Sequence, residues 1–154
     1  AGDVKSISAD HLMAVSDEGI QALRENNVIA TLLPGTTFFL GKREYAPYKK
    51  LKNAGIDIAL ATDYNPGSCN IQSMPFIISL ACIYLGMNIL EAIKASTFIA
   101  ARSLIRDKTI GSIEKGKIAD IIVWNINSVQ QIPYTVTDHP IQYVFKNGKT
   151  VFTA

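Results

Sequence analysis

Hydrophobic and polar positions change their spacing several times along the first part of the chain, and the changes predict alternating strands and helices. Three apolar runs favour strands, at residues 4–9, 28–33 and 56–62. Two intervening stretches have the capping residues and apolar spacing of helices, at residues 16–27 and 44–53. Residues 36–41 are expected to form a loop after a Pro-Gly pair. The β-α-β-α-β order predicts parallel strands joined by right-handed crossovers.

The middle of the chain predicts two more helices. Residues 71–85 are apolar nearly all round, which is typical of a buried helix. Asn88 and Glu91 have the spacing of a capping box, which predicts another helix over residues 88–104.

The last part of the chain favours strands instead. A strand is expected at residues 118–124, and a hairpin at residues 141–152 around an Asn-Gly turn. The chain is therefore expected to be an α/β protein, with an α/β part at residues 1–109 and a small all-β part at residues 110–154.

The composition excludes several classes of protein. The 154 residues are 48% hydrophobic and 18% charged, which is enough apolar material for a buried core. The net charge of +2 gives no reason to expect nucleic acid or an anionic membrane as a partner. No apolar run reaches the roughly 18 residues that span a bilayer. Cys69 and Cys82 lack metal-ligand spacing, and we interpret them as reduced thiols of a cytoplasmic protein.

Candidate functional residues follow the predicted strands. His11 comes after the first strand, residues 33–36 after the second and Asp63 after the third, and (β/α)-barrel enzymes carry their active sites at these carboxyl ends. Asp63 could be a metal ligand or a catalytic base, and His11 a hydrogen-bond donor, proton carrier or metal ligand. The alternatives are structural. Asp63 could cap the next turn or pair with a surface lysine, because Asp before an Asn-Pro-Gly-Ser turn is ordinary turn chemistry, and His11 could cap the following loop. His139, in a polar loop, is interpreted as structural.

Three segments carry a resemblance to a known family. They are Ser-Ala-Asp-His-Leu at residues 8–12, Leu-Leu-Pro-Gly-Thr-Thr-Phe-Phe-Leu at residues 32–40, and Ala-Thr-Asp-Tyr-Asn-Pro-Gly-Ser at residues 61–68. Together they are similar to the imidazolonepropionases of the amidohydrolase superfamily, which are metal-dependent hydrolases. The resemblance implies that residues 1–109 are the carboxyl-terminal portion of a TIM (β/α)8 barrel, comprising strands six to eight with their helices. It also implies that residues 110–154 are strands of a small composite β-sandwich domain.

The resemblance also implies roles for five residues. Asp63 matches the metal-binding aspartate of a site that holds one divalent ion, Zn or Fe, and it also acts as the catalytic base. His11 matches a catalytic histidine beside the metal. Asn65 and Gly67 match contacts to the product, N-formimidoyl-L-glutamate, and Ser68 matches a contact to the substrate, 4-imidazolone-5-propanoate. The implied activity is the ring-opening hydrolysis of that small-molecule substrate in histidine degradation.

The remaining metal ligands of the family are not in this sequence. No His-x-His pair occurs, so the other ligands are expected outside this chain, in a missing N-terminal half of the enzyme. The start at Ala1-Gly2-Asp3, without Met, also leads us to expect a piece of a longer protein, inactive by itself. Ile7, Leu32 and Leu60 are expected on an exposed inward face, so the piece should associate with the missing half or form a homo-oligomer.

Two other functions remain open from the sequence. One is a related amidohydrolase such as a nucleobase deaminase, whose reaction centre would be similar. The other is a non-catalytic scaffold domain that keeps the fold without the chemistry.

Overall fold

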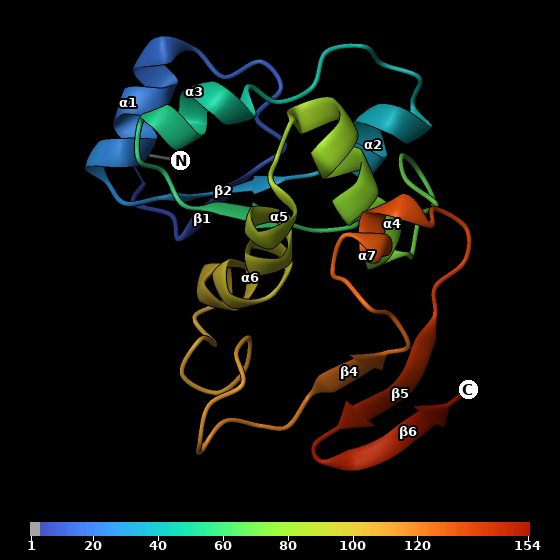
Figure 1. Cartoon of the computed structure of the whole chain (residues 1–154). Helices are drawn as coiled ribbons and strands as arrows, with labels where there is room; N and C mark the ends of the chain where they lie inside the picture. Colours follow the sequence, from blue (N-terminus) through green and yellow to red (C-terminus); the bar gives the residue numbers. More distant parts are fainter. Residues whose placement is uncertain (1–3) are drawn as a thin grey trace.

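Three parallel strands form the first sheet of the computed structural model, which describes residues 4–154; the Ala1-Gly2-Asp3 start lies outside the described residues. The strands lie in the order β1 (Ser8–Asp10), β2 (Ile29–Leu32) and β3 (Ile58–Leu60). The connecting helices are α1 (Asp17–Glu25), α2 (Pro34–Phe39) and α3 (Tyr48–Asn53), as Figure 1 shows. The predicted parallel pairing is confirmed. The predicted β-α-β-α-β order is incomplete, because two helices, α2 and α3, lie between β2 and β3.

Local steric rules explain where these elements depart from the predicted bounds. The first strand starts later because Val4 and Lys5 lie in a turn, with Lys5 at a φ of 48°. The loop prediction for residues 36–41 is wrong, because helix α2 starts at Pro34 and continues through Phe39. A proline is tolerated in the first turn of a helix, since an N–H at that position would have no partner within the helix. The helix predicted from residue 44 starts only after Pro47, whose ψ of 65° is not helical.

The middle of the chain is helical, as predicted, but in more pieces. These are α4 (Met74–Leu80), the π-helix η1 (Ala81–Leu85), α5 (Ile89–Ser96) and α6 (Phe98–Ser103). Gly86 ends the π-helix in the left-handed conformation, with a φ of 69°. The capping box of Asn88 and Glu91 is confirmed. The helix predicted over residues 88–104 is divided, because Thr97 has a φ of −125° and a ψ of −85°. None of the helices formed by residues 4–154 is long and apolar enough to cross a membrane.

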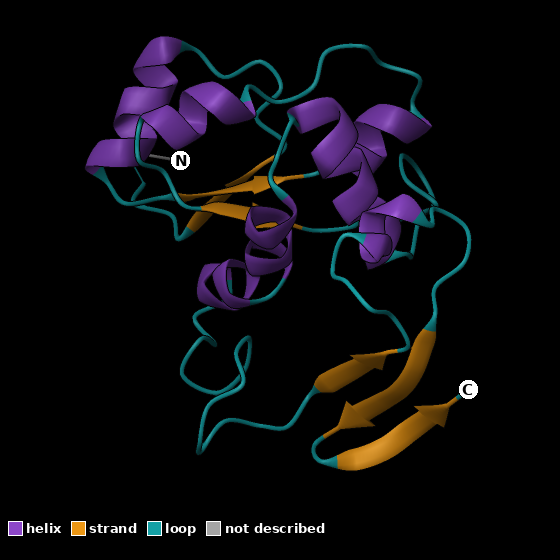
Figure 2. Ribbon diagram, in the orientation of Figure 1, coloured by secondary structure: helices purple, strands orange, loops and turns teal. Residues whose placement is uncertain are grey.

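A second, antiparallel sheet ends the chain, and Figure 2 shows it apart from the helices around the first sheet. Its strands are β4 (Ile121–Trp124), β5 (Ile141–Lys146) and β6 (Lys149–Thr153). Asn147 and Gly148 both have positive φ, as a type I′ hairpin turn requires, so the predicted hairpin is confirmed. The sequence did not predict α7 (Gln131–Tyr134), whose Ile132 is buried in the main core. The Ser79 hydroxyl of α4 donates to the carbonyl of Pro133 at 2.9 Å, which joins α7 to α4.

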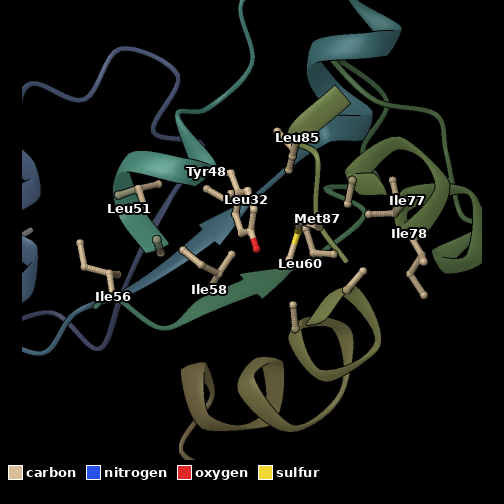
Figure 3. Packing of buried hydrophobic residues seen from close by; sticks show 14 of the residues in the cluster. Leu32, Tyr48, Leu51, Ile56, Ile58, Leu60, Ile77, Ile78, Leu85 and Met87 are labelled. Atoms are coloured by element: carbon tan, nitrogen blue, oxygen red, sulfur yellow. The ribbon is translucent and has the colours of Figure 1, made fainter. Parts of the chain in front are cut away.

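The hydrophobic core lies between the first sheet and the helices on one of its faces (Figure 3). Leu32 and Leu60 are 0% and 2% exposed, so the prediction that they lie on an exposed face is wrong. They belong to the same core cluster as Leu51 of α3 and Ile77 of α4, which cover this face of the sheet. Ile7, by contrast, is 47% exposed, as predicted.

Candidate functional site

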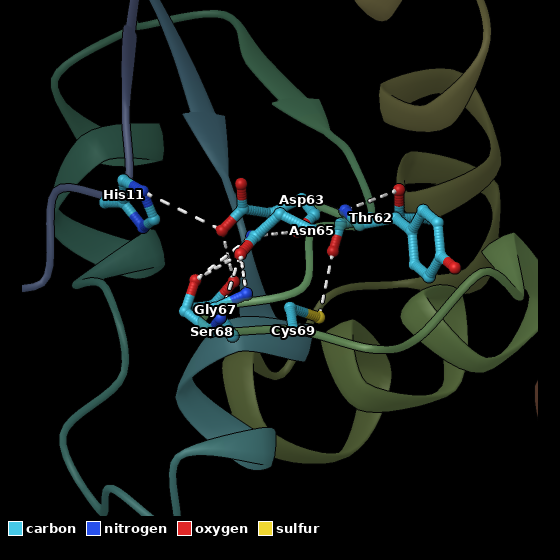
Figure 4. Close-up of polar contacts among 9 residues, drawn as sticks. His11, Thr62, Asp63, Asn65, Gly67, Ser68 and Cys69 are labelled. Atoms are coloured by element: carbon cyan, nitrogen blue, oxygen red, sulfur yellow. Dashed lines mark hydrogen bonds and ion pairs between the residues drawn. The ribbon is translucent and has the colours of Figure 1, made fainter.

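His11 and Asp63 lie together at the carboxyl ends of the parallel strands (Figure 4). His11 follows β1, Asp63 comes three residues after the end of β3, and both have left-handed backbone conformations, with φ of 68° and 53°. The imidazole Nε2 of His11 is 3.9 Å from Oδ2 of Asp63. Left-handed backbone is uncommon for residues other than glycine, and it concentrates at sites where geometry matters more than local stability. The fold therefore brings the imidazole of His11 and the carboxylate of Asp63, both predicted from the sequence, into one site.

A buried threonine contacts the carboxylate of Asp63. Thr36 donates a hydrogen bond of 2.6 Å from Oγ1 to Oδ2 of Asp63, and only 3% of Thr36 is exposed. The sequence interpretation placed Thr36 after the second strand, at the same edge of the sheet as the other two residues, but assigned it no role. The sequence did not indicate that its hydroxyl reaches the carboxylate of Asp63.

The side chain of Asn65 organises the turn that follows Asp63. Its Oδ1 accepts hydrogen bonds of 2.8 Å from the backbone N–H groups of both Gly67 and Ser68. Its Nδ2 donates to the backbone carbonyl of Asp63 at 2.6 Å and to Oγ of Ser68 at 3.0 Å. The backbone N–H of Asn65 donates to the carbonyl of Cys69 at 2.9 Å and closes the turn. The three predicted ligand-binding residues thus form one preorganised turn beside the carboxylate.

The turn packs against closely fitted buried residues. Cys69 is fully buried, and its thiol donates to the carbonyl of Thr62 at 3.2 Å. A Cβ added at Gly35, in the first turn of α2, would lie 2.6 Å from Cδ1 of Ile77 and 3.3 Å from Sγ of Cys69. Glycine, which has no Cβ, lets α2 approach this closely, whereas a larger residue would require the side chain of Ile77 to move. This packing determines where α2 presents Thr36.

The chemical groups present can form one side of a metal site. Carboxylate and imidazole are ordinary ligands of Zn and Fe, and Nε2 is the His11 nitrogen that faces Asp63. Nδ1 of His11 is buried and has no hydrogen-bond partner among residues 4–154. No group of three His, Cys, Asp or Glu side chains in the described part of the chain could hold a metal ion. Asp63 and His11 therefore fit a metal only as part of a larger ligand set.

His139 lies in a different environment. Its Nε2 is 2.8 Å from Oγ of Ser73, which is the N-cap of α4 and accepts from the backbone N–H of Phe76. This contact attaches the loop before β5 to the start of α4. The geometry agrees with the interpretation of His139 as structural.

Comparison with known sequences gives a consistent result over nearly the whole chain. The profile of the Amidohydrolase family matches residues 3–151. Over 151 residues the chain is 43% identical to the imidazolonepropionase of Alkaliphilus oremlandii, covering 98% of this chain and 36% of that relative. It is 46% identical over 149 residues to the imidazolonepropionase of Phocaeicola vulgatus, covering 97% of this chain and 36% of the relative. The chain thus spans little more than a third of the length of the curated relatives it matches.

Solved structures share the fold at lower sequence identity. An adenosine deaminase from Xanthomonas campestris with bound zinc superposes with a TM-score of 0.81 and 23% identity, covering 95% of this chain and 37% of that one. A variant of the atrazine chlorohydrolase of Arthrobacter aurescens, complexed with zinc and atraton, gives a TM-score of 0.85 and 19% identity, covering 97% and 37%. At these identities the likeness establishes the arrangement of the chain and not its chemistry.

Proposed function

The chain belongs to the amidohydrolase family, and we propose that it forms the carboxyl-terminal part of an imidazolonepropionase. The main support is that the chain is 43–46% identical to imidazolonepropionases and brings their predicted site residues together. Asp63 lies beside His11, and a hydrogen bond from Asn65 to its backbone carbonyl connects it to the preorganised turn. The proposed reaction is the hydrolysis of 4-imidazolone-5-propanoate to N-formimidoyl-L-glutamate.

We propose that the first sheet is part of a (β/α)8 barrel. In this assignment β1, β2 and β3 are barrel strands six to eight within residues 1–109, and the antiparallel sheet within residues 110–154 belongs to a β-sandwich. The parallel order and the helical crossovers support the barrel assignment. The outer edges of β1 and β3 would then pair with strands of the missing N-terminal part.

Asp63 would hold one divalent metal ion, Zn or Fe, with the other ligands supplied by the missing part. When bound, such an ion polarises a carbonyl group and lowers the pKa of water. Zinc is bound in two solved structures with the same fold, which supports a metal of this kind. The approach of His11 Nε2 to Asp63 supports a place for His11 beside the ion.

The residues of this chain would then direct proton transfer during ring opening. Water adds to the ring carbonyl carbon while Asp63 accepts a proton from it. His11 donates a hydrogen bond to the developing oxyanion. The ring C–N bond breaks as Asp63 returns the proton to the leaving nitrogen, so that the carboxylate is regenerated. The chain without its metal and missing ligands is expected to be inactive.

The turn after Asp63 would bind the rest of the substrate. We propose that Asn65 and Gly67 contact the product and that Ser68 contacts the substrate. A ligand can approach the backbone closely at Gly67, because that residue has no Cβ. In the structure the N–H groups of Gly67 and Ser68 donate to Asn65 Oδ1, so a ligand must either share these donors or replace that acceptor. We also propose a cytoplasmic setting, which suits the free thiols of Cys69 and Cys82.

The experiment uses the whole polypeptide that carries this chain, purified with its metal. It is assayed with 4-imidazolone-5-propanoate and, in parallel, with guanine and cytosine, and its metal content is measured. Hydrolysis of the imidazolone with a stoichiometric metal ion is the expected result. Turnover of a nucleobase alone would replace the proposal with a deaminase, and absence of both turnover and metal would replace it with a scaffold.

A further inference from the structure

We propose that Thr36 is the positioning residue for Asp63: its hydroxyl holds the carboxylate in one orientation and so determines which oxygen faces a metal ion or water. This inference rests on the proposed function, since it assigns Asp63 the role of ligand and base. It adds a residue from a different strand end to the site.

The contact has the geometry of a strong hydrogen bond. At 2.6 Å, the distance from Thr36 Oγ1 to Asp63 Oδ2 lies in the range for a hydroxyl donating to a carboxylate. The direction is determined by chemistry, because an ionised carboxylate can only accept and the hydroxyl must donate. Thr36 is 3% exposed, so little water competes for the hydroxyl.

The hydroxyl is held in place by the fold. Thr36 lies in the first turn of α2, where its N–H donates to the carbonyl of Leu33 at 3.2 Å. A β-branched side chain has few accessible rotamers, and the close packing at Gly35 holds the turn against Cys69 and Ile77. The donor is therefore oriented before any ligand arrives.

Asp63 is consequently held at two points. Asn65 Nδ2 holds its backbone carbonyl at 2.6 Å, and Thr36 holds its carboxylate. The hydrogen bond from Thr36 and the contact with His11 Nε2 both fall on Oδ2, and Oδ1 takes part in neither. A partner of this kind restricts how a ligating carboxylate can turn and adjusts its basicity.

The test compares three variants of the whole polypeptide. Thr36→Val removes the hydroxyl while keeping the shape, and Thr36→Ser keeps the hydroxyl. Thr37→Val makes the same chemical change at a neighbour that is 2% exposed and is not the donor to Asp63. The measurements are kcat and KM with 4-imidazolone-5-propanoate, the Kd for Zn²⁺ in competition with a chelator, and the Tm.

We expect Thr36→Val to lose about 10–100-fold in kcat or in Zn²⁺ affinity, with Thr36→Ser close to the wild type and Thr37→Val unchanged. Equal kcat and equal Kd for Thr36→Val and Thr37→Val would overturn the proposal. So would a loss in Thr36→Val that Thr36→Ser reproduces, because the hydroxyl would then not be responsible. If the wild type binds Zn²⁺ but does not hydrolyse the imidazolone, the proposed function fails, while the Zn²⁺ affinities still decide the role of Thr36.

Discussion

Asn65 donates a hydrogen bond of 2.6 Å from Nδ2 to the backbone carbonyl oxygen of Asp63, a residue with a φ of 53°. The same side chain accepts from two N–H groups of the following turn. One amide side chain thus links the unusual backbone conformation of the candidate base to the loop proposed to bind ligands.

Replacing Asn65 by Ala should destabilise the chain by about 1–3 kcal/mol, because partly buried donors and acceptors lose their partner. Urea unfolding followed by circular dichroism measures the difference. Asn70→Ala, at an exposed position in the same segment, is the control and should change stability by less than about 0.5 kcal/mol. Equal midpoints for the two variants would show that the Asn65 hydrogen bonds do not stabilise the fold.

Gly35→Ala should destabilise the chain by about 1–3 kcal/mol, because the new Cβ overlaps buried atoms that have little room to move. That Cβ would lie 2.6 Å from Cδ1 of Ile77. The control is Gly67→Ala, where the nearest atom, Oδ1 of Asn65, is 3.4 Å away. Thermal unfolding compares the two, and a Tm for Gly35→Ala at or above that of Gly67→Ala would contradict the packing argument.

Glu91 should make stability depend on pH in acid. Hydrogen bonds from Lys52 and Tyr48 hold the pKa of Glu91 below its ordinary value of 4.5. A lowered pKa means that the ionised form stabilises the fold at neutral pH and that this contribution disappears as pH falls through the folded-state pKa. Because both side chains of the Lys52–Glu91 pair are substantially exposed, solvent screening keeps this contribution small.

The measurement is the free energy of unfolding between pH 7 and pH 3. Glu91→Gln should be less stable than the wild type at pH 7, and the difference should shrink as pH falls below about 4.5. Glu44→Gln, on an exposed loop, provides the control. A difference that stays constant across this range would rule out the ionised carboxylate as its source.

Asp63→Asn in the whole polypeptide should lower kcat by about 10²–10⁴-fold, since an amide cannot accept and return the proton. Steady-state kinetics with 4-imidazolone-5-propanoate provide the measurement, with metal content determined in parallel. Asp17→Asn, which alters an exposed ion pair with Lys50, should leave kcat unchanged. A fully active Asp63→Asn enzyme would remove Asp63 from the mechanism.

The 154-residue chain by itself should associate in solution. β1 and β3 each pair with β2 on one side, so each has an outer edge that can pair with another strand. Light scattering across a range of concentrations measures this, and homo-oligomers are the expected species. A monomer at all concentrations would contradict the expectation.

The sequence by itself determined the order of the three strands in the first sheet and indicated helices in the regions of α1 and α3, because period and capping are local properties. The apolar run at residues 28–33 and the capping box at Asn88 needed no information from elsewhere in the chain. The Asn-Gly pair likewise determined the hairpin, since few other residues accept positive φ at both positions. Parallel pairing then followed, so the meeting of His11 and Asp63 was predictable.

Only the tertiary structure decided which faces are covered and which distant groups meet. Leu32 and Leu60 are buried because helices pack over their side of the sheet, and a continuous apolar run does not say which side the helices cover. Thr36 and Asp63 are 27 residues apart, and their hydrogen bond depends on how closely α2 packs at Gly35. Such contacts arise from the packing of separate elements, so no local pattern encodes them.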